Sequence, residues 1–446
     1  MRSRISAFLI SMALPFCIGA WCVLSAQAPS QAQATNATAG DELKFVVVIS
    51  RHGVRSPTGK ADQLNNYSRQ PWPAWGVPPG YLTAHGAQLM TLFGSYDREL
   101  LSAQGLLSPS GCGNATQIRI IADSDQRTRE TGNALAAGLA PGCAIEVTAL
   151  PEGTADPLFH PLAAGLGPPD KLLATAAVSG RIGANPQGIA EAYRPQFQAL
   201  EDVLLACNAG HNCAAPATPA PASLFDIPAS LAPGKGDHLV DLRSPLGTAS
   251  TMAEDLLLEY TEGMDAANVG WGRVDGHKLR ELVQLHTASE DIVQRTPYIA
   301  RAQSSNLLFH VLQSIKQALS EAPVPGALTH SADRLLIVVG HDTNLANIGG
   351  ALGLSWLIDG RRDDTPPGGA LVFELWKKHG SQVYLVRTFF TAQSLDQMRS
   401  ASPLSTSSPP ERVPVFMPAC SRADNSCELE AFQQAMHAQI VSAFVK

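Results

Sequence analysis

The sequence predicts an α/β protein with an inserted, mainly helical part, and three observations carry that prediction. Three segments repeat one design, in which a short strand ends at a polar turn and a helix-like stretch follows. The strands are Phe45–Ile49, Ile118–Ala122 and Leu335–Val339. Their apolarity is continuous rather than alternating, which is typical of strands covered on both faces. From about Leu172 to Tyr298, helical periodicity dominates and few strand signals interrupt it.

The segment before the first strand predicts export. Arg2 and Arg4 precede an apolar stretch that runs to about Leu24, and an Ala-x-Ala sequence follows at Ala26–Ala28. These are the three parts of a secretory signal peptide. An uncleaved membrane anchor is the alternative, because the stretch is long enough to cross a bilayer. The position of the Ala-x-Ala sequence favours cleavage, so we expect residues 1–28 to be removed and the mature protein to be periplasmic or secreted.

Length and charge limit the remaining possibilities. Removing 28 residues from 446 leaves 418, which is too long for one simple core. We expect an α/β domain formed by residues 41–168 and 294–446, and a helical insertion domain at 169–293. The mature chain has 30 basic and 39 acidic residues, because two arginines leave with the signal. This acidic balance predicts no general attraction to nucleic acid or anionic membranes, so a phosphate site needs a local concentration of positive charge. We expect the mature protein to be a monomer.

Six cysteines remain after cleavage, and an even number in an exported chain predicts three disulfides. Six cysteines allow 15 pairings. Short loop closure favours Cys207–Cys213 and Cys420–Cys427, which leaves Cys112–Cys143. The alternative is a metal site that includes His211. No C-x-x-C motif and no clear fourth ligand accompany that histidine, which favours the disulfides.

The later elements extend the same plan. The second strand continues into the polar turn Asp123–Thr128 and a helix-like stretch through Leu139, and the third strand ends at the turn Gly340–Asn344. Two further segments, Ala370–Trp376 and Val383–Phe389, are predicted to be neighbouring sheet strands. In open α/β sheets the site lies outside the carboxyl ends of the strands, so we expect the three charged turns to meet at one edge.

The first turn, Arg51–Pro57 (Arg-His-Gly-Val-Arg-Ser-Pro), gives the strongest functional signal. Arg51 and Arg55 repel each other unless an anion lies between them, and guanidinium groups match phosphate oxygens in bidentate fashion. Nearby positive charge lowers the pKa of His52, so one ring nitrogen stays unprotonated and nucleophilic at acidic pH. Gly53 allows close approach of the backbone. The motif therefore predicts phosphoryl transfer with His52 as the nucleophile.

The other two turns supply what such a reaction still needs. Arg127 and His341 can place positive charge on the phosphoryl oxygens, and Asp342 can protonate the leaving alcohol. Taken singly, these residues have ordinary explanations: a His-Asp pair is usually a turn or a cap, and Asp123 and Asp125 are typical helix caps. Their combination at three strand ends favours a site.

On these motifs the chain resembles the histidine acid phosphatases, the second branch of the histidine phosphatase superfamily, and within it the bacterial periplasmic acid phosphatase/phytase group. The resemblance extends from about Leu43 to Cys427. The segments that carry it are Ser50–Thr58, Ile121–Arg129, Gly270–Gly276, Gly340–Asn347 and Asp364–Gly369.

The resemblance implies a mixed sheet, a helical domain over the cleft, no metal or other cofactor, and a small organic phosphate as substrate. It implies that His52 is the nucleophile and Asp342 the proton donor. Beyond these, the groups implied to hold the phosphoryl group or the rest of the substrate are Arg51, Arg55, Thr58, Arg127, His286 and His341.

Three departures bear on the substrate. Residues Leu82–Gly86 are Leu-Thr-Ala-His-Gly, where the group often has Leu-Thr-Pro-Arg-Gly. Gly59 occupies a position at which phytases often have lysine. The cysteines of a fourth disulfide are missing from the sequence. The Asp-Thr-Asn sequence at Asp342–Asn344 instead matches the phytase-like form. We expect an acid phosphatase that acts on phytate and other small organic phosphates.

Three alternatives remain at this point. The first is a narrow sugar-phosphate phosphatase of the glucose-1-phosphate type. The second is a non-catalytic organophosphate-binding protein, although such a protein usually loses the nucleophile or the acid first, and both His52 and Asp342 are present. The third, a phosphoglycerate-mutase-type enzyme, shares Arg-His-Gly but lacks a signal peptide and an Asp after its second His.

Overall fold

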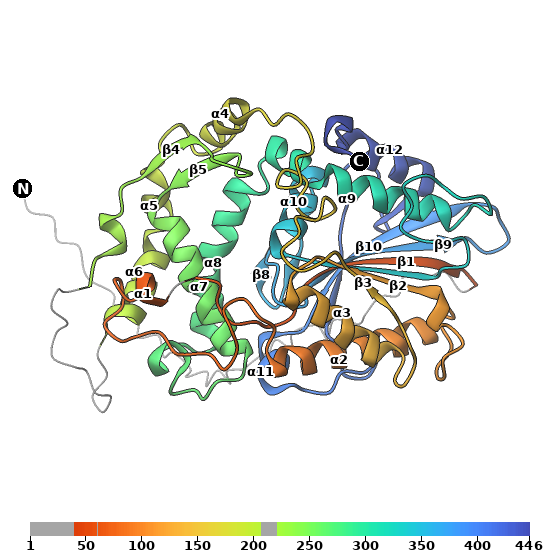
Figure 1. The fold of residues 1–446 in the computed structure, drawn as a ribbon, viewed down its shortest axis with the longest axis horizontal. Helices are drawn as coiled ribbons and strands as arrows, with labels where there is room; N and C mark the ends of the chain where they lie inside the picture. Colours follow the sequence, from red (N-terminus) through yellow and green to blue (C-terminus); the bar gives the residue numbers. More distant parts are fainter. Residues whose placement is uncertain (1–39, 60, 207–220) are drawn as a thin grey trace, which may run out of the picture. The chain divides into compact units, whose positions relative to one another are not determined.

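The computed structural model describes residues 40–59, 61–206 and 221–446. Within them, eight strands form one sheet in the order β11-β10-β9-β1-β6-β2-β3, with β12 also paired to β10 (Figure 1). β1, β6, β2 and β3 are parallel neighbours, whereas β9, β10, β11 and β12 join them by antiparallel pairing. The predicted α/β class with a mixed sheet is confirmed. The strands of this sheet are β1 (Glu42–Arg51), β2 (Ile118–Ala122), β3 (Val147–Thr148), β6 (Leu335–Gly340), β9 (Ala370–Lys377), β10 (Tyr384–Ala392), β11 (Glu411–Pro414) and β12 (Ser426–Glu428).

Helices and two small strand pairs complete the described structure. The short strand pairs are β4 (Ser230–Pro233) with β5 (Val240–Arg243), and β7 (Leu357–Ile358) with β8 (Arg361–Arg362). The α-helices are α1 (Ala61–Leu64), α2 (Ala84–Ala103), α3 (Gln126–Leu139), α4 (Lys171–Arg181), α5 (Gly188–Ala192), α6 (Arg194–Leu205), α7 (Pro245–Thr261), α8 (Gly276–Val293), α9 (Pro297–Gln317), α10 (Asp342–Leu352), α11 (Leu395–Ser400) and α12 (Leu429–Gln439). The 3-10 helices are η1 (Ala115–Gln117), η2 (Leu224–Asp226), η3 (Val269–Gly272) and η4 (Ser442–Phe444).

The central strand β1 shows why its apolar run is continuous. Phe45, Val47 and Ile49 pack into a core with α9, α10 and α12 on one face of the sheet. Val46 and Val48 pack with α2 and α3 on the other face. Figure 1 shows the same three layers, with α2 and α3 below the sheet and α9, α10 and α12 above it. Both faces of the strand are therefore removed from water, as the sequence pattern predicted.

The helical part has a core of its own. Helices α6, α7 and α8 bury Phe197, Leu200, Leu256 and Leu282 against one another. In Figure 1 these helices, with α4, α5 and the β4–β5 pair, lie beside the end of the sheet at which the predicted turns are located. Side chains of α7 and α8 are thereby brought to the ends of the parallel strands.

Two of the three predicted disulfides are present, Cys112–Cys143 and Cys420–Cys427. The third predicted pair, Cys207–Cys213, lies outside the described residues, as do His211 and the predicted signal peptide at residues 1–28.

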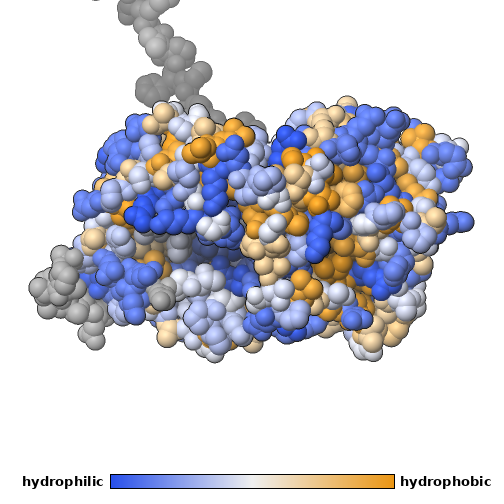
Figure 2. Space-filling model, turned by 45° about the horizontal axis from the view of Figure 1, so that its top comes forward, coloured by the Kyte–Doolittle hydropathy of each residue, from blue (hydrophilic) through white to orange (hydrophobic). Residues whose placement is uncertain are grey.

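None of the helices among the described residues is long and apolar enough to cross a bilayer. Figure 2 shows one face of the molecule, on which hydrophilic and apolar side chains are mixed and a hollow is bordered mainly by hydrophilic groups.

Candidate active site

Strand pairing brings the three charged turns together. β1 and β6 are parallel with Arg51 opposite Gly340, and β2 pairs with β6 up to Ala122 opposite Val339. The three strands therefore end at the same edge, in the order β1-β6-β2. The pairing continues into the turns, because the backbone N–H of His52 donates to the Gly340 carbonyl at 2.9 Å. The predicted convergence of the turns is confirmed.

In the His52 ring, one nitrogen donates a hydrogen bond and the other keeps its lone pair. Its Nδ1 lies 2.8 Å from the Gly53 carbonyl, which can only accept, so Nδ1 carries the proton and donates. Nε2 then has a lone pair. Burial, followed by the charges of Arg51, Arg55 and Arg127, holds the pKa of His52 well below its ordinary value. The direction agrees with the prediction, although burial contributes more than the arginines.

Gly53 is required by close packing. A β-carbon at this position would lie 2.8 Å from Met90 Cγ and 3.2 Å from the Gly86 carbonyl oxygen. The Gly53 N–H also donates to Thr131 Oγ1 of α3 at 2.9 Å. The turn that carries His52 is thus fixed against both α2 and α3, as expected for a site that needs a rigid nucleophile.

Three arginines meet at this edge. Arg51 is fully buried, and its Nη1 donates to the Thr365 carbonyl at 2.7 Å, in one of the segments that carried the resemblance. Arg127 Nη2 lies 3.3 Å from His341 Nδ1 and 2.5 Å from Asp125 Oδ2. The Nε atoms of Arg51, Arg55 and Arg127 have no hydrogen-bond partner among the described residues. Such donors suit an anion.

The sequence analysis missed Glu254, which lies at the centre of this charge cluster. It comes from α7, and its Oε1 pairs with Arg51 Nη2 and, at 3.0 Å, with Arg55 Nη2. Burial alone would raise the pKa of Glu254, but the charges of Arg55 and Arg51 lower it below its ordinary value. One signal was available, because Glu254 is followed by Asp255 in a helix whose neighbouring positions are apolar.

Asp342 is the first residue of α10 and faces the same arginines. Its Oδ1 accepts the Thr343 N–H at 2.7 Å, and its Oδ2 lies 3.0 Å from Arg51 Nη2. Burial would raise its pKa, but Arg51, then His286 and Arg55, hold the pKa well below its usual range. In the absence of substrate Asp342 is therefore ionised.

Asp123 does not cap α3. Its Oδ1 accepts the Ser124 N–H, and its Oδ2 accepts from His341 Nε2 at 2.6 Å and from His160 Nε2 at 2.8 Å. Asp125 occupies the N-cap position of α3 but makes no side-chain capping hydrogen bond. Asp125 is thus the N-cap residue, as interpreted, whereas the cap interpretation of Asp123 is wrong. Asp123 instead fixes the tautomer of His341, with the proton on Nε2.

His286, from α8, lies beside two of the acids of this cluster. Its Nδ1 lies 3.1 Å from Ser250 Oγ, and its Nε2 has no partner among the described residues. Ligand atoms of Glu254, His286 and Asp342 all lie within 4.8 Å of one another. Glu290, another residue that the sequence analysis missed, lies near these groups, where burial raises its pKa well above the ordinary value.

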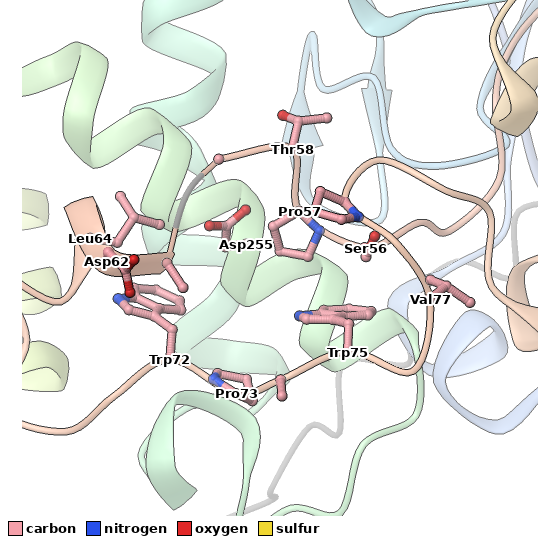
Figure 3. A pocket seen from close by; sticks show the side chains of 14 residues that line it. Ser56, Pro57, Thr58, Asp62, Leu64, Trp72, Pro73, Trp75, Val77 and Asp255 are labelled. Atoms are coloured by element: carbon pink, nitrogen blue, oxygen red, sulfur yellow. The ribbon is translucent and has the colours of Figure 1, made fainter.

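Thr58 is exposed at the mouth of a cavity of about 520 Å³ beside the arginine cluster. The walls are mainly apolar and include Trp72, Trp75 and Pro57, while Asp255 faces them from α7 (Figure 3). Asp255 Oδ2 has no partner among the described residues, and burial raises the pKa of this carboxyl to about 8. The Asp255 carboxyl therefore adds no negative charge to the cavity wall at acidic pH.

The departure at Leu82–Gly86 is located at the start of α2. Thr83 Oγ1 accepts the Gly86 N–H at 2.9 Å and so begins α2. His85 Nε2 contacts the Met398 carbonyl at 2.8 Å. His85 thus contacts α11.

The fold and the cluster together define a phosphatase that uses histidine, and the chain belongs to the histidine phosphatase superfamily (branch 2), whose sequence profile matches residues 42–172 and 250–391. Its enzyme class is that of the phosphoric monoester hydrolases. The predictions of family and of enzyme class are confirmed.

Individual relatives are phytases and glucose-1-phosphatases. The chain is 37% identical to the phytase AppA of Escherichia coli over 423 residues, 93% of this chain and 96% of that protein. It is 29% identical to a glucose-1-phosphatase of Salmonella typhimurium, over 92% of this chain and 95% of that protein. The solved structure of Hafnia alvei phytase in complex with tartrate matches 92% of this chain and 100% of its own, with 34% identity and a TM-score of 0.83.

Proposed function

We propose that this protein hydrolyses phosphomonoesters, phytate among them, through a phosphohistidine on Nε2 of His52, with Asp342 as the proton donor. The observation that carries the proposal is the setting of His52. Its Nδ1 donates to the Gly53 carbonyl, and the positive charges of three arginines act on the buried ring.

In the first step Nε2 attacks phosphorus, the P–O bond to the alcohol breaks, and the leaving oxygen takes the proton of Asp342. In the second step water attacks phosphorus, Asp342 accepts a proton from that water, and the N–P bond breaks to release inorganic phosphate. Arg51, Arg55 and Arg127 stabilise the charge on the phosphoryl oxygens throughout.

Asp342 has to be protonated when the alcohol leaves, although it is ionised in the free site. The same arginines that hold its pKa low are the groups that bind the phosphate. A bound phosphoryl dianion offsets their charge, and burial then favours the neutral acid. The substrate monoanion can supply this proton, which explains why we expect activity at acidic pH.

His341 is proposed to hold a phosphoryl oxygen through Nδ1. In the free site Nδ1 accepts from Arg127, and burial lowers the pKa of His341 despite the opposing effect of Asp123. The ring therefore gains its second proton only when a phosphoryl group lies between it and Arg127. Thr58 and His286 are proposed to contact the rest of the substrate.

The order of sequence identities, 37% to a phytase and 29% to a glucose-1-phosphatase, favours phytate over a single sugar phosphate. A narrow glucose-1-phosphate-type phosphatase is the second candidate. We also propose that residues 1–28 are a signal peptide, that the mature protein is a periplasmic or secreted monomer, and that residues 169–293 form a helical domain inserted into an α/β domain of residues 41–168 and 294–446.

The test is a kinetic panel on the purified mature protein in EDTA at mildly acidic pH, with p-nitrophenyl phosphate, phytate, glucose 1-phosphate and nucleotides. We expect turnover of several esters, loss of turnover in His52→Ala, and wild-type turnover in His277→Ala, which replaces an exposed histidine of α8. An inactive wild type or an active His52→Ala protein rules the proposal out. Turnover of glucose 1-phosphate alone would select the second candidate.

A further inference from the structure

Two histidines and two carboxylates gather on the β2 side of the arginine cluster. Asp123 and Asp125 follow β2, His341 follows β6, and His160 lies in the loop between β3 and α4. The ligand atoms of Asp123, His160 and His341 all lie within 4.8 Å of one another. Asp125 Oδ2 is 3.8 Å from His341 Nε2. The proposed reaction uses only His341 of these four residues.

Backbone hydrogen bonds hold the members of this cluster in place. The Asp123 N–H donates to the Val339 carbonyl at 3.0 Å, and the His160 N–H donates to the Asp156 carbonyl at 2.7 Å. The Asn344 amide of α10 donates to the Phe159 carbonyl at 2.9 Å, which ties the His160 loop to the helix after His341. The cluster is therefore formed by the fold itself and does not depend on flexible side chains alone.

Both imidazoles present Nε2 to the same carboxylate oxygen of Asp123, at 2.6 and 2.8 Å. Tetrahedral zinc with nitrogen and oxygen ligands at 2.0–2.2 Å needs ligand atoms roughly 3.3 Å apart. A small outward rotation of the two rings provides that spacing. The Asp123 and His341 side chains are nearly inaccessible, but 40% of the His160 side chain is exposed, so a cation can enter from that side.

The charges distinguish this cluster from a neighbouring one. Glu254, His286 and Asp342 also lie within 4.8 Å of one another, but both acids of that set are paired with Arg51. In that set, the Arg51 guanidinium already neutralises the two carboxylates that a metal ion would need as ligands. In the Asp123 cluster one arginine, Arg127, faces two carboxylates, and no second arginine is paired with either of them among the described residues.

We propose that Asp123, His160 and His341 form a binding site for a divalent transition-metal ion of the Zn²⁺ class, with Asp125 as a fourth ligand, and that occupation of this site inhibits the enzyme. The two imidazole ligands suit such ions better than Mg²⁺ or Ca²⁺. The metal binds the lone pair of each Nε2, and the proton that Nε2 carries in the free site moves to Nδ1 of the same ring.

The inhibition follows from His341 and rests on the proposed function. With Zn²⁺ on Nε2, the outward rotation of the His341 ring moves Nδ1 from the position in which it accepts from Arg127 Nη2 at 3.3 Å in the free site. Arg127 also loses its ion pair with Asp125 to the metal. The two groups that hold phosphoryl oxygens are thus both displaced.

The direct test is calorimetric titration of the EDTA-stripped, full-length mature protein with Zn²⁺ at pH 7. We expect one ion per chain in the wild type. His160→Asn should lower the affinity by about 10–100-fold, because its amide can still donate to Asp123 but is a poor zinc ligand. His238→Asn removes a histidine that is 82% exposed and lies beside Asp237, and it should bind as the wild type does.

The inhibition is measured as the ratio of phosphate release with and without Zn²⁺ within each protein, so a change in basal rate does not enter. We expect inhibition of the wild type and of His238→Asn, and little inhibition of His160→Asn. Absence of saturable binding, or equal binding by His160→Asn, would overturn the site. Binding without inhibition would overturn the regulatory role. Because the titration needs no turnover, it reports on the site even if the proposed function fails.

Discussion

Replacing Asp342 by Asn separates the proton donor from the rest of the phosphoryl site. Asn is nearly the same size and its amide oxygen can still accept the Thr343 N–H, so α10 should begin as it does in the wild type. It cannot deliver a proton to the leaving oxygen. The ion pair with Arg51 at 3.0 Å is also removed, but Arg51 keeps Glu254 as a partner and is not left as an uncompensated buried charge.

The expected size of the effect depends on the leaving group. For alkyl esters such as phytate or glycerol phosphate, loss of a general acid lowers kcat by about 10²–10⁴-fold, which corresponds to about 3–5 kcal/mol in the barrier at 1.36 kcal/mol per tenfold. For p-nitrophenyl phosphate, whose leaving phenolate needs no proton, we expect less than about a tenfold loss. KM should stay constant or fall, because the substrate then has to replace one carboxylate fewer at Arg51.

The assay is steady-state release of phosphate from both ester types, with Asp265→Asn, an exposed acid after α7, as the matched control. Circular dichroism establishes that each variant is folded. The reasoning is refuted if the Asp342→Asn protein loses the same factor on p-nitrophenyl phosphate as on alkyl esters, since the missing proton would then not be the cause.

Three further predictions concern charge and stability. Glu254→Gln removes the carboxylate that pairs with Arg51 and Arg55. The inhibition constant of inorganic phosphate should fall about tenfold, which is the free energy of about one charge-assisted hydrogen bond. An unchanged inhibition constant contradicts this. Asp255 has a folded-state pKa raised to about 8, so its contribution to stability is complete below pH 3.8 and is lost as the pH rises through 8. Between pH 5 and pH 9 the wild type should lose about 4 kcal/mol more unfolding free energy than Asp255→Asn in urea titrations, and parallel curves would argue against a neutral Asp255. Opening the Cys112–Cys143 disulfide, whose cysteines are 31 positions apart, should cost about 4 kcal/mol, and opening Cys420–Cys427, whose cysteines are 7 positions apart, about 2 kcal/mol. Urea unfolding of the paired Cys→Ser variants should show that order.

The sequence could predict the parts of this protein that local patterns determine. Continuous apolar runs located the parallel strands, and the placement of a polar turn after each one located the edge where His52, Arg127 and Asp342 meet. The pattern succeeds because strand direction alone places those turns on one side of the sheet. The motif around His52 also indicated the chemistry before any partner residue was placed.

Groups supplied by the helical part and by loops could not be predicted in the same way. Glu254 reaches the arginines only through the packing of α7 against the end of the sheet, a contact between residues about 200 positions apart in the chain. His160 lies in a loop without a motif, and its role depends on a hydrogen bond to Asp123, 37 positions away. Asp123 itself was interpreted as a cap because its position before a helix is typical of one, whereas its actual partners are two histidines.

The most direct test of the central claim is to trap the phosphorylated enzyme. The wild-type protein is mixed with radiolabelled phosphomonoester at acidic pH, quenched with base within milliseconds because phosphohistidine is labile to acid, and digested for peptide mass spectrometry. The account predicts a single phosphoryl group on the peptide that carries His52, absent from His52→Ala and accumulating in proportion to enzyme during the first turnover. Rapid turnover with no phosphoryl group on that peptide, or with the group on another residue, contradicts it.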